Sequence, residues 1–400
     1  MKRVMFLLLV ALTLTAPRNF SQVMGLTHGQ PPHLPAPYIK PIVANLPRVS
    51  VSPGFKPQAP QGFTVSLFAN GFKEPRWLAV APNGDVFVSD TSAGKVYVLG
   101  DPGNGQKSNS RAVFAAGLKE PFGIAFHADY VYVADTNKVV RFRYDPKTSR
   151  RAGEREPVLD LPGGGMHFTR TVQFSPDGNK MYVSVGSPSN VTPAKDPRRA
   201  AILVADPEGR DDSIYASGLR NAVGIGFDPD SGQLWASVNE RDLLGDNLPP
   251  DYFTHVVQDG FYGWPYSYIG KNVDARAKPP RPDLVAKALV PDVLLGPHVA
   301  PLEFAFYTGR QFPAKYWHGA FVAEHGSWNR SIYNGYRVVF IPFKDGQPQA
   351  APSAFLTGFD SDPHSKSVNG RPVGVAVAKD GSLLVSDDGG RDIWRISRSQ

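Results

Sequence analysis

Short hydrophobic runs recur along the chain, and many are separated by a turn that contains Gly beside Asp or Asn. Such turns occur at residues 82–85 (Pro-Asn-Gly-Asp), 176–179 (Pro-Asp-Gly-Asn) and 379–382 (Lys-Asp-Gly-Ser). These residues tolerate a positive φ, so an Asn-Gly or Asp-Gly pair between two strand-forming runs indicates a β-hairpin. With 39 Gly and 38 Pro in 400 residues, the sequence favours many tight turns over long helices.

The hairpins belong to a repeat. The predicted first strands of the successive units centre on Leu78, Ile124, Val172, Ile225, Phe304 and Val375. The first three intervals, 46, 48 and 53 residues, are close to the roughly 40–45 residues of a four-stranded blade, whereas intervals of 79 and 71 residues indicate insertions around 240–297 and 324–369. Six units closed in a ring predict an all-β, six-bladed β-propeller with loop insertions. A β-sandwich is the alternative, but it does not require near-equal repeats.

The N-terminal part precedes the repeat. An apolar run at residues 4–16 follows two basic residues and is short for a membrane span, which is typical of a secretory signal peptide; an uncleaved anchor is the alternative. We expect a signal peptide at about 1–22, a Pro-rich lead-in without regular structure at 23–55, and the propeller at 56–400. The protein is then expected to be exported, either to the periplasm or out of the cell.

Composition narrows the possible chemistry. The chain has no cysteine, which excludes covalent c-type haem and thiolate-bound metals. Any electrons from a redox reaction must therefore leave to a separate partner. The net charge of +7 is scattered, without the basic block that a nucleic-acid partner requires.

Several polar residues stand at the same place in the repeat, just before a predicted first strand. They are Arg76, Glu120, His167, Arg220, Asn221, His298 and Arg371. If the ring closes, they converge on one end of the central channel, where a rigid scaffold commonly carries functional residues. Buried charge is costly unless it is paired, so this set favours an anionic or multiply hydrogen-bonding ligand. Each residue alone has a structural alternative, such as an ion pair to a neighbouring loop.

His167 follows the glycine-rich turn 163–165 and is the candidate general base, because a neutral imidazole is available near pH 7. A strand-capping role is the alternative. A second polar region, residues 239–251, contains Glu240, Asp242, Asp246 and Asp251. Oxygen ligands without Cys or His suit Ca²⁺, although a solvated acidic loop is the alternative.

These motifs resemble a known family. Gly218-Leu219-Arg220-Asn221, the stretch 235–246 and Tyr262-Gly263-Trp264-Pro265 are similar to the pyrroloquinoline-quinone (PQQ)-dependent soluble aldose and sorbosone dehydrogenases, from about residue 60 to 398. Asn-Glu-Arg-Asp followed by Gly-Asp and Pro-Pro-Asp-Tyr is most similar to the sorbosone branch, as is 370–374.

The resemblance implies a sugar or polyol substrate, PQQ and Ca²⁺ as cofactors, and a separate cytochrome or quinone as electron acceptor. It implies that His167 is the base, that Arg220 polarises the quinone beside Asn221, and that Arg371 holds a cofactor carboxylate. It also places Ca²⁺ at backbone carbonyls of Glu240 and Arg241. The remaining candidates for cofactor contacts are Arg76, Glu120, His298 and Arg330.

The sequence departs from the aldose dehydrogenases of this family, the glucose-oxidising members among them, at three positions. Gly326 stands where they have Lys, which leaves Arg330 as the nearest cation; Val373 replaces a second Arg; and His298 replaces a small hydroxyl residue. These differences argue against the cofactor affinity of those members and against glucose as the substrate. Two other functions compete: a Ca²⁺-dependent lactonase or hydrolase that activates water with His167, and a binding propeller without catalysis. The Arg-rich cluster disfavours the first, and the convergence of His, Arg and Asn disfavours the second.

Overall fold

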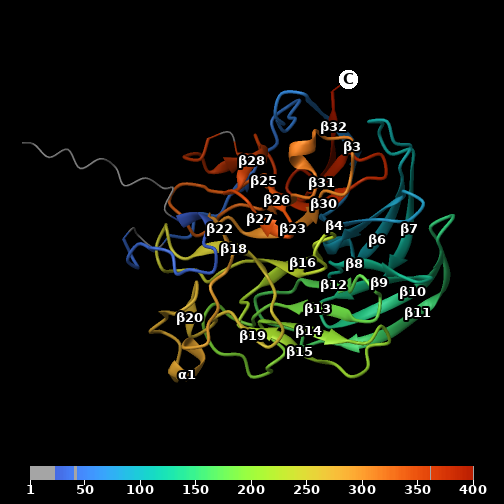
Figure 1. The fold of residues 1–400 in the computed structure, drawn as a ribbon. Helices are drawn as coiled ribbons and strands as arrows, with labels where there is room; N and C mark the ends of the chain where they lie inside the picture. Colours follow the sequence, from blue (N-terminus) through green and yellow to red (C-terminus); the bar gives the residue numbers. More distant parts are fainter. Residues whose placement is uncertain (1–22, 40–42, 361, 400) are drawn as a thin grey trace, which may run out of the picture.

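Six antiparallel sheets surround a central channel in the computed structural model, which describes residues 23–39, 43–360 and 362–399 (Figure 1). The first strand of each sheet contacts the first strands of both neighbouring sheets, so that the ring closes. The predicted all-β, six-bladed propeller is therefore confirmed. The predicted signal peptide, 1–22, lies outside the described residues. Within the described part of the chain, no helix has the length and apolar character needed to cross a membrane.

Each blade has four strands that follow one another from the channel outward. The strands of the first three blades are β4 (Pro75–Val80), β5 (Val86–Asp90), β6 (Lys95–Gly100) and β7 (Ser110–Ala116); β8 (Ile124–His127), β9 (Tyr130–Asp135), β10 (Lys138–Asp145) and β11 (Arg150–Asp160); and β12 (Arg170–Phe174), β13 (Met181–Val185), β14 (Ala201–Ala205) and β15 (Ser213–Ser217). The strands of the other three are β16 (Ala222–Phe227), β17 (Leu234–Val238), β18 (Pro250–His255) and β22 (Val293–Pro297); β23 (Pro301–Phe306), β24 (Ala320–Glu324), β25 (Arg337–Ile341) and β28 (Ser353–Leu356); and β30 (Pro372–Val377), β31 (Leu383–Asp387), β32 (Asp392–Arg398) and β3 (Phe63–Asn70). All six predicted first strands lie next to the channel.

The hydrophobic core lies between the blades. Six clusters of buried side chains lie between neighbouring sheets; Phe87 and Val131, for example, pack between the first and second blades, in a cluster that also reaches the channel. The sixth blade contains the N-terminal and the C-terminal strands of the propeller, because β3 pairs with β32. Alternation along the strands thus buries one set of side chains against each neighbour, as the sequence pattern predicts.

Four of the first strands contain β-bulges close to the cavity. β4, β16, β23 and β30 each shift register near their first residues. A β-bulge re-aims the side chains around it. Arg76, Val223 and Leu302 lie within three of these bulges, and all three line the cavity described below.

Most of the remaining elements lie in insertions. They are the short strands β19 (Gly260–Phe261), β20 (Ser267–Tyr268), β21 (Asn272–Val273), β26 (Phe343–Lys344), β27 (Gln347–Pro348) and β29 (Ser367–Val368), the helix α1 (Pro282–Val285), and the 3₁₀ turns at Thr91–Ala93 and Ala314–Tyr316. Two loops without strands reach the channel. We call residues 239–249, between β17 and β18, the acidic loop, and residues 325–331, after β24, the His325 loop.

The lead-in differs from the expectation. It contains two short strands: β1 (Met24–Leu26) adds to the fourth blade by pairing with β22, and β2 (Arg48–Val49) pairs with β29. The expectation that the lead-in has no regular structure is therefore wrong for these residues. Unpaired backbone groups on β22 and β29 provide partners that the local sequence does not show.

Candidate functional site

A cavity of about 330 Å³ opens at one end of the channel, within the size range of small-molecule sites. Its polar lining consists of Arg76, His167, Thr169, Arg220, Asn221, Asn239, Glu240, Asp242, Asp251, His298, His325 and Arg371. Its apolar lining includes Met166, Phe168, Val223, Leu302 and Trp328. The convergence predicted for six of the seven residues before the first strands is thus present.

His167 is oriented by its own hydrogen bonds. Its Nδ1 lies 2.9 Å from the Ser187 carbonyl oxygen and 3.0 Å from Ser187 Oγ. Because a carbonyl only accepts, Nδ1 carries the proton, and Nε2 keeps its lone pair. Burial, together with the positive charge of Arg220, lowers the pKa of His167 to about 3. The imidazole is therefore neutral at physiological pH, with Nε2 able to accept a proton.

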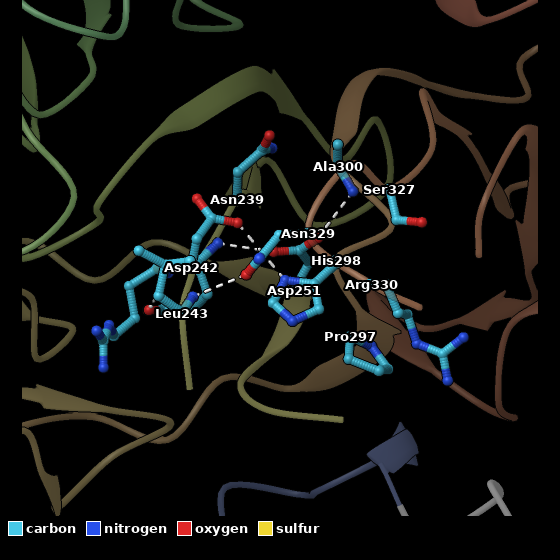
Figure 2. A network of polar contacts seen from close by, with 12 residues as sticks. Asn239, Asp242, Leu243, Asp251, Pro297, His298, Ala300, Ser327, Asn329 and Arg330 are labelled. Atoms are coloured by element: carbon cyan, nitrogen blue, oxygen red, sulfur yellow. Dashed lines mark hydrogen bonds and ion pairs between the residues drawn. The ribbon is translucent and has the colours of Figure 1, made fainter. Parts of the chain in front are cut away.

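Arg220 connects the cavity to the acidic loop. Its guanidinium donates to the Glu240 carbonyl oxygen at 2.6 Å and lies 3.1 Å from Asp242 Oδ2. Asp242 also faces His298, whose Nδ1 is 3.6 Å away and whose Nε2 donates to the Gly245 carbonyl at 2.9 Å (Figure 2). Burial lowers the pKa of His298, but the nearby Asp242 carboxylate, the Gly245 carbonyl and Asp251 together outweigh burial and raise the pKa overall.

The Tyr-Gly-Trp-Pro motif supports Arg220 from behind. Trp264 Nε1 donates to the Asn190 carbonyl at 2.8 Å, and Asn190 Oδ1 accepts from Arg220 at 3.1 Å. Gly218, just before Arg220, has φ +74°, and a Cβ there would lie 2.8 Å from the backbone nitrogen of Gly263. The two motifs that carry the family resemblance therefore pack directly on one another.

A second cluster of charged and polar side chains joins residues from the N-terminal and C-terminal parts of the propeller. Arg76 forms an ion pair with Asp388, and His325 Nε2 is 3.0 Å from the same carboxylate. Burial opposes ionisation, but His325 and Arg76 hold the pKa of Asp388 well below its usual range. Burial and the nearby Arg371 lower the pKa of His325 to about 4.

Arg371 is different from the other two cavity arginines. Its guanidinium donates to the carbonyl oxygens of His325 and Gly326, at 3.3 and 3.4 Å, and lies over the Tyr336 ring, 5.9 Å from the ring centroid. No carboxylate lies within ion-pair distance of it among the described residues. Burial lowers its pKa. A cation of this kind, placed in a cavity wall, is suited to an anionic ligand.

The acidic residues are occupied by the protein itself. Asp251 accepts from the backbone amides of Glu240 and Ala300, at 2.7 and 2.8 Å, and burial raises its pKa to about 7. Asp246 accepts from the Ser331 amide at 3.1 Å. In the described ranges, no three His, Cys, Asp or Glu side chains are grouped so that they could hold a metal ion. The structure thus does not gather the predicted carboxylates into one ligand set.

Four predicted site residues lie outside the cavity lining. Glu120 is exposed and accepts from Thr136 Oγ1 at 3.0 Å within its own blade. Arg330 donates to the Asp246 carbonyl at 3.0 Å, and Arg241 forms a buried ion pair with Asp274 at 2.8 Å. Asp246 is the fourth. The prediction that Glu120 joins the cavity is wrong because its side chain, exposed in the turn four residues before β8 begins, bonds to Thr136 instead.

Sequence reasoning missed Asp388 and gave no specific role to His325. The Asp387-Asp388 pair directly after the predicted strand around Leu384 was a usable signal, because it stands at the turn before the last strand. Its partners Arg76 and His325 come from other blades, however, and no local pattern identifies them.

Some buried polar atoms in the cavity wall lack a partner within the described chain. Among them are Arg76 Nε, Asn221 Oδ1 and Glu240 Oε1. Burial raises the pKa of Glu240 to about 8, although Arg220 opposes the shift. Since unpaired buried polar groups are costly, these atoms are suited to a bound ligand or ion.

Fold and cavity together define a six-bladed propeller with a polar small-molecule site at one end of its channel. A family model of TrAA12-like proteins matches residues 57–249 and 284–399. The chain therefore belongs to the TrAA12-like family. It is also 31% identical over 357 residues to an uncharacterized protein of Borreliella burgdorferi, a match that covers 85% of this chain and 90% of that protein.

Characterised relatives are more distant. The PQQ-dependent pyranose dehydrogenase of Coprinopsis cinerea is 26% identical over 413 residues, which cover 86% of this chain and 55% of the relative, so the chain spans about half of that protein. The holo form of the PQQ domain of the Coprinopsis cinerea pyranose dehydrogenase superposes with a TM-score of 0.76 at 24% identity, covering 88% of this chain and 99% of that domain. The PQQ-bound aldose sugar dehydrogenase of Streptomyces coelicolor gives 0.59 at 21% identity, over 85% and 99%. These two superpositions establish the shared fold.

Proposed function

We propose that this protein is a PQQ-dependent dehydrogenase that oxidises a sugar or a sugar-derived alcohol or aldehyde. The single observation that carries the proposal is Arg371, a guanidinium in the cavity wall that bonds to two carbonyl oxygens and has no carboxylate within ion-pair distance among the described residues. PQQ carries several carboxylates, and a guanidinium binds a carboxylate through paired hydrogen bonds. The name of the Coprinopsis cinerea relative supports the same cofactor.

The residues of the cavity fit this chemistry. When bound, PQQ supplies the acceptor for the hydride that leaves the substrate carbon. His167 Nε2 is placed to accept the proton of the substrate hydroxyl, because Ser187 holds Nδ1 as the donor. Arg220 contributes positive charge where negative charge develops. Arg371, together with Arg76 Nε, would hold cofactor carboxylates.

A Ca²⁺ ion is proposed beside Glu240. Glu240 Oε1 lacks a partner among the described residues, and the side chain lines the cavity. Hard oxygen donors are the ligands that Ca²⁺ prefers. Asp242 and Asp251 are bonded to Arg220 and to backbone amides, which leaves them less suited to a carboxylate-held metal. The same pairing disfavours the alternative of a Ca²⁺-dependent hydrolase.

Three finer statements remain part of the proposal. Sorbosone and related compounds are the expected substrates, on the motifs named above. Electrons pass to a separate cytochrome or quinone, since the chain has no cysteine to attach haem. The apolar run at 4–16 supports export.

The test is a titration of metal-stripped protein with PQQ, with and without Ca²⁺, followed by the absorption spectrum. We expect saturable, Ca²⁺-dependent binding, and bleaching when aldoses or sorbosone are added. Arg371→Gln should raise the Kd of PQQ about ten- to hundredfold, because a hydrogen bond to a charged group is lost. The exposed Arg150→Gln is the matched control and should leave the Kd unchanged. Absence of binding under both conditions would contradict the proposal.

A further inference from the structure

The lead-in contacts the two loops that approach the cavity, at Tyr38 and at Asn45. Figure 1 shows this blue segment beside β22 and β18. The Tyr38 amide donates to the Leu244 carbonyl of the acidic loop at 2.6 Å. The Asn45 amide donates to the Trp328 carbonyl of the His325 loop, also at 2.6 Å. The same N-terminal segment therefore contacts both loops.

Asn329 is the junction of these segments. Its side chain is 2% exposed. Its Oδ1 accepts from the Leu243 amide at 2.8 Å (Figure 2). Its Nδ2 donates to the Val43 carbonyl at 2.6 Å. One amide thereby links the His325 loop, the acidic loop and the lead-in.

The bond to Leu243 fixes a strained residue. Leu243 has φ 69°, a left-handed conformation that costs a branched residue about 1–2 kcal/mol and persists only where neighbours enforce it. The preceding residue is Asp242, which pairs with Arg220 and faces His298. Holding Leu243 in this conformation therefore holds the carboxylate at the cavity wall.

Asn45 holds the other loop from outside. Its Nδ2 lies 3.3 Å from the carbonyl oxygens of both Arg330 and Ser331. The segment is anchored separately by the pairing of β2 with β29. Loss of the Asn45 side-chain amide would thus leave residues 48–49 paired with β29 and remove only the side-chain bonds to the His325 loop.

We propose that residues 43–49 form a strap and that Asn45 and Asn329 are positioning residues of the site. The strap bonds to the His325 loop, whose Asn329 bonds in turn to the acidic loop, and it thereby sets the positions of Asp242 and Trp328 in the cavity wall. The effect on ligand affinity rests on the proposed function, whereas the effect on the loops does not.

The first experiment uses the full chain without cofactor. Asn45→Ala removes the two Nδ2 bonds but keeps the backbone bond to Trp328. Asn272→Ala is the matched control, because Asn272 Nδ2 likewise donates to two carbonyls, of Tyr268 and Ile269, at 3.1 and 2.9 Å, away from the cavity lining. Hydrogen exchange at 242–245 and 325–331 should become about fivefold faster in Asn45→Ala alone.

A second variant separates the two bonds of the junction. Asn329→Asp keeps an acceptor for the Leu243 amide but loses the donor to Val43. It should accelerate exchange in the same two segments and, like Asn45→Ala, raise the Kd of PQQ about fivefold. The melting temperatures of Asn45→Ala and Asn272→Ala should agree, because both lose equivalent bonds.

The outcomes are distinct. Unchanged exchange in both loops, or equal acceleration in Asn272→Ala, would overturn the strap. Faster exchange with an unchanged Kd in a protein that binds PQQ would overturn the positioning role. Faster exchange in a protein that binds no PQQ would refute the proposed function but support the strap.

Discussion

At the scale of single residues, the site depends on which atoms the protein leaves free. Ser187 occupies His167 Nδ1, so that Nε2 alone is available for proton transfer. Arg371 bonds to carbonyl oxygens and has no carboxylate within ion-pair distance in the described chain, although it lines the cavity. Arg220 is instead fully engaged by Asp242 and by backbone carbonyls. The two arginines therefore differ in how many donors they have available for a ligand. The residue type alone does not reveal this difference.

The pH dependence of turnover tests the environment of His167. Because its pKa is lowered to about 3, the neutral base persists as the pH falls through about 6.5, where an ordinary imidazole gains its proton. We expect kcat/KM for the sugar to show no acid limb near pH 6.5 that is due to this residue. His167→Ala should abolish turnover while PQQ still binds. Protonation of the His167 imidazole near pH 6.5 in an NMR titration, or full turnover of His167→Ala, would contradict this role.

At the scale of elements, hydroxyl side chains connect neighbouring blades around the channel. Ser386 Oγ on β31 accepts from the Gly374 amide at 2.7 Å and donates to the Arg76 carbonyl on β4. Ser237 on β17 likewise accepts from the Gly224 amide at 3.0 Å and bonds to the Leu302 carbonyl on β23. These bonds satisfy backbone groups that the bulges free from the sheets, and so maintain the bulges that aim cavity residues.

Ser386→Ala measures one such connection. It leaves the Gly374 donor and the Arg76 acceptor buried without a partner, which should lower the free energy of unfolding by about 2 kcal/mol. Denaturant unfolding monitored by fluorescence gives the value. Ser213→Ala, at an exposed position on β15, is the control and should change stability by less than about 0.5 kcal/mol. Equal effects of the two substitutions would show that the Ser386 connection is not stabilising.

At the scale of the whole molecule, stability depends on closing the ring. β3 pairs with β32, and Phe68 on β3 packs between the sixth and first blades with Leu78 and Ile393. The N-terminal and C-terminal parts of the propeller therefore share one core cluster. The cavity adjoins this closure, since Arg76 and Asp388 pair across it.

Phe68→Ala tests the closure. The side chain is fully buried, so its truncation should cost about 3–5 kcal/mol through lost burial and a residual cavity. Thr64→Ala, at an exposed position of the same strand, should cost little. Calorimetry of both variants compares them directly. A loss below about 1 kcal/mol for Phe68→Ala would show that the closure contributes little to stability.

The sequence by itself determined the blades and much of the cavity. Hairpin turns and alternation are local properties, and ring closure places equivalent positions of each repeat together, which is why Arg76, His167, Arg220 and Arg371 could be assigned to one end of the channel. Tertiary structure decided the partners. Groups far apart in the chain decide whether Asp242 binds an ion or Arg220. They also decide whether Glu120 reaches the cavity and where the lead-in lies. Hydrogen bonds and ion pairs act over a few ångströms in space, so a local sequence pattern carries no record of which distant residue supplies them.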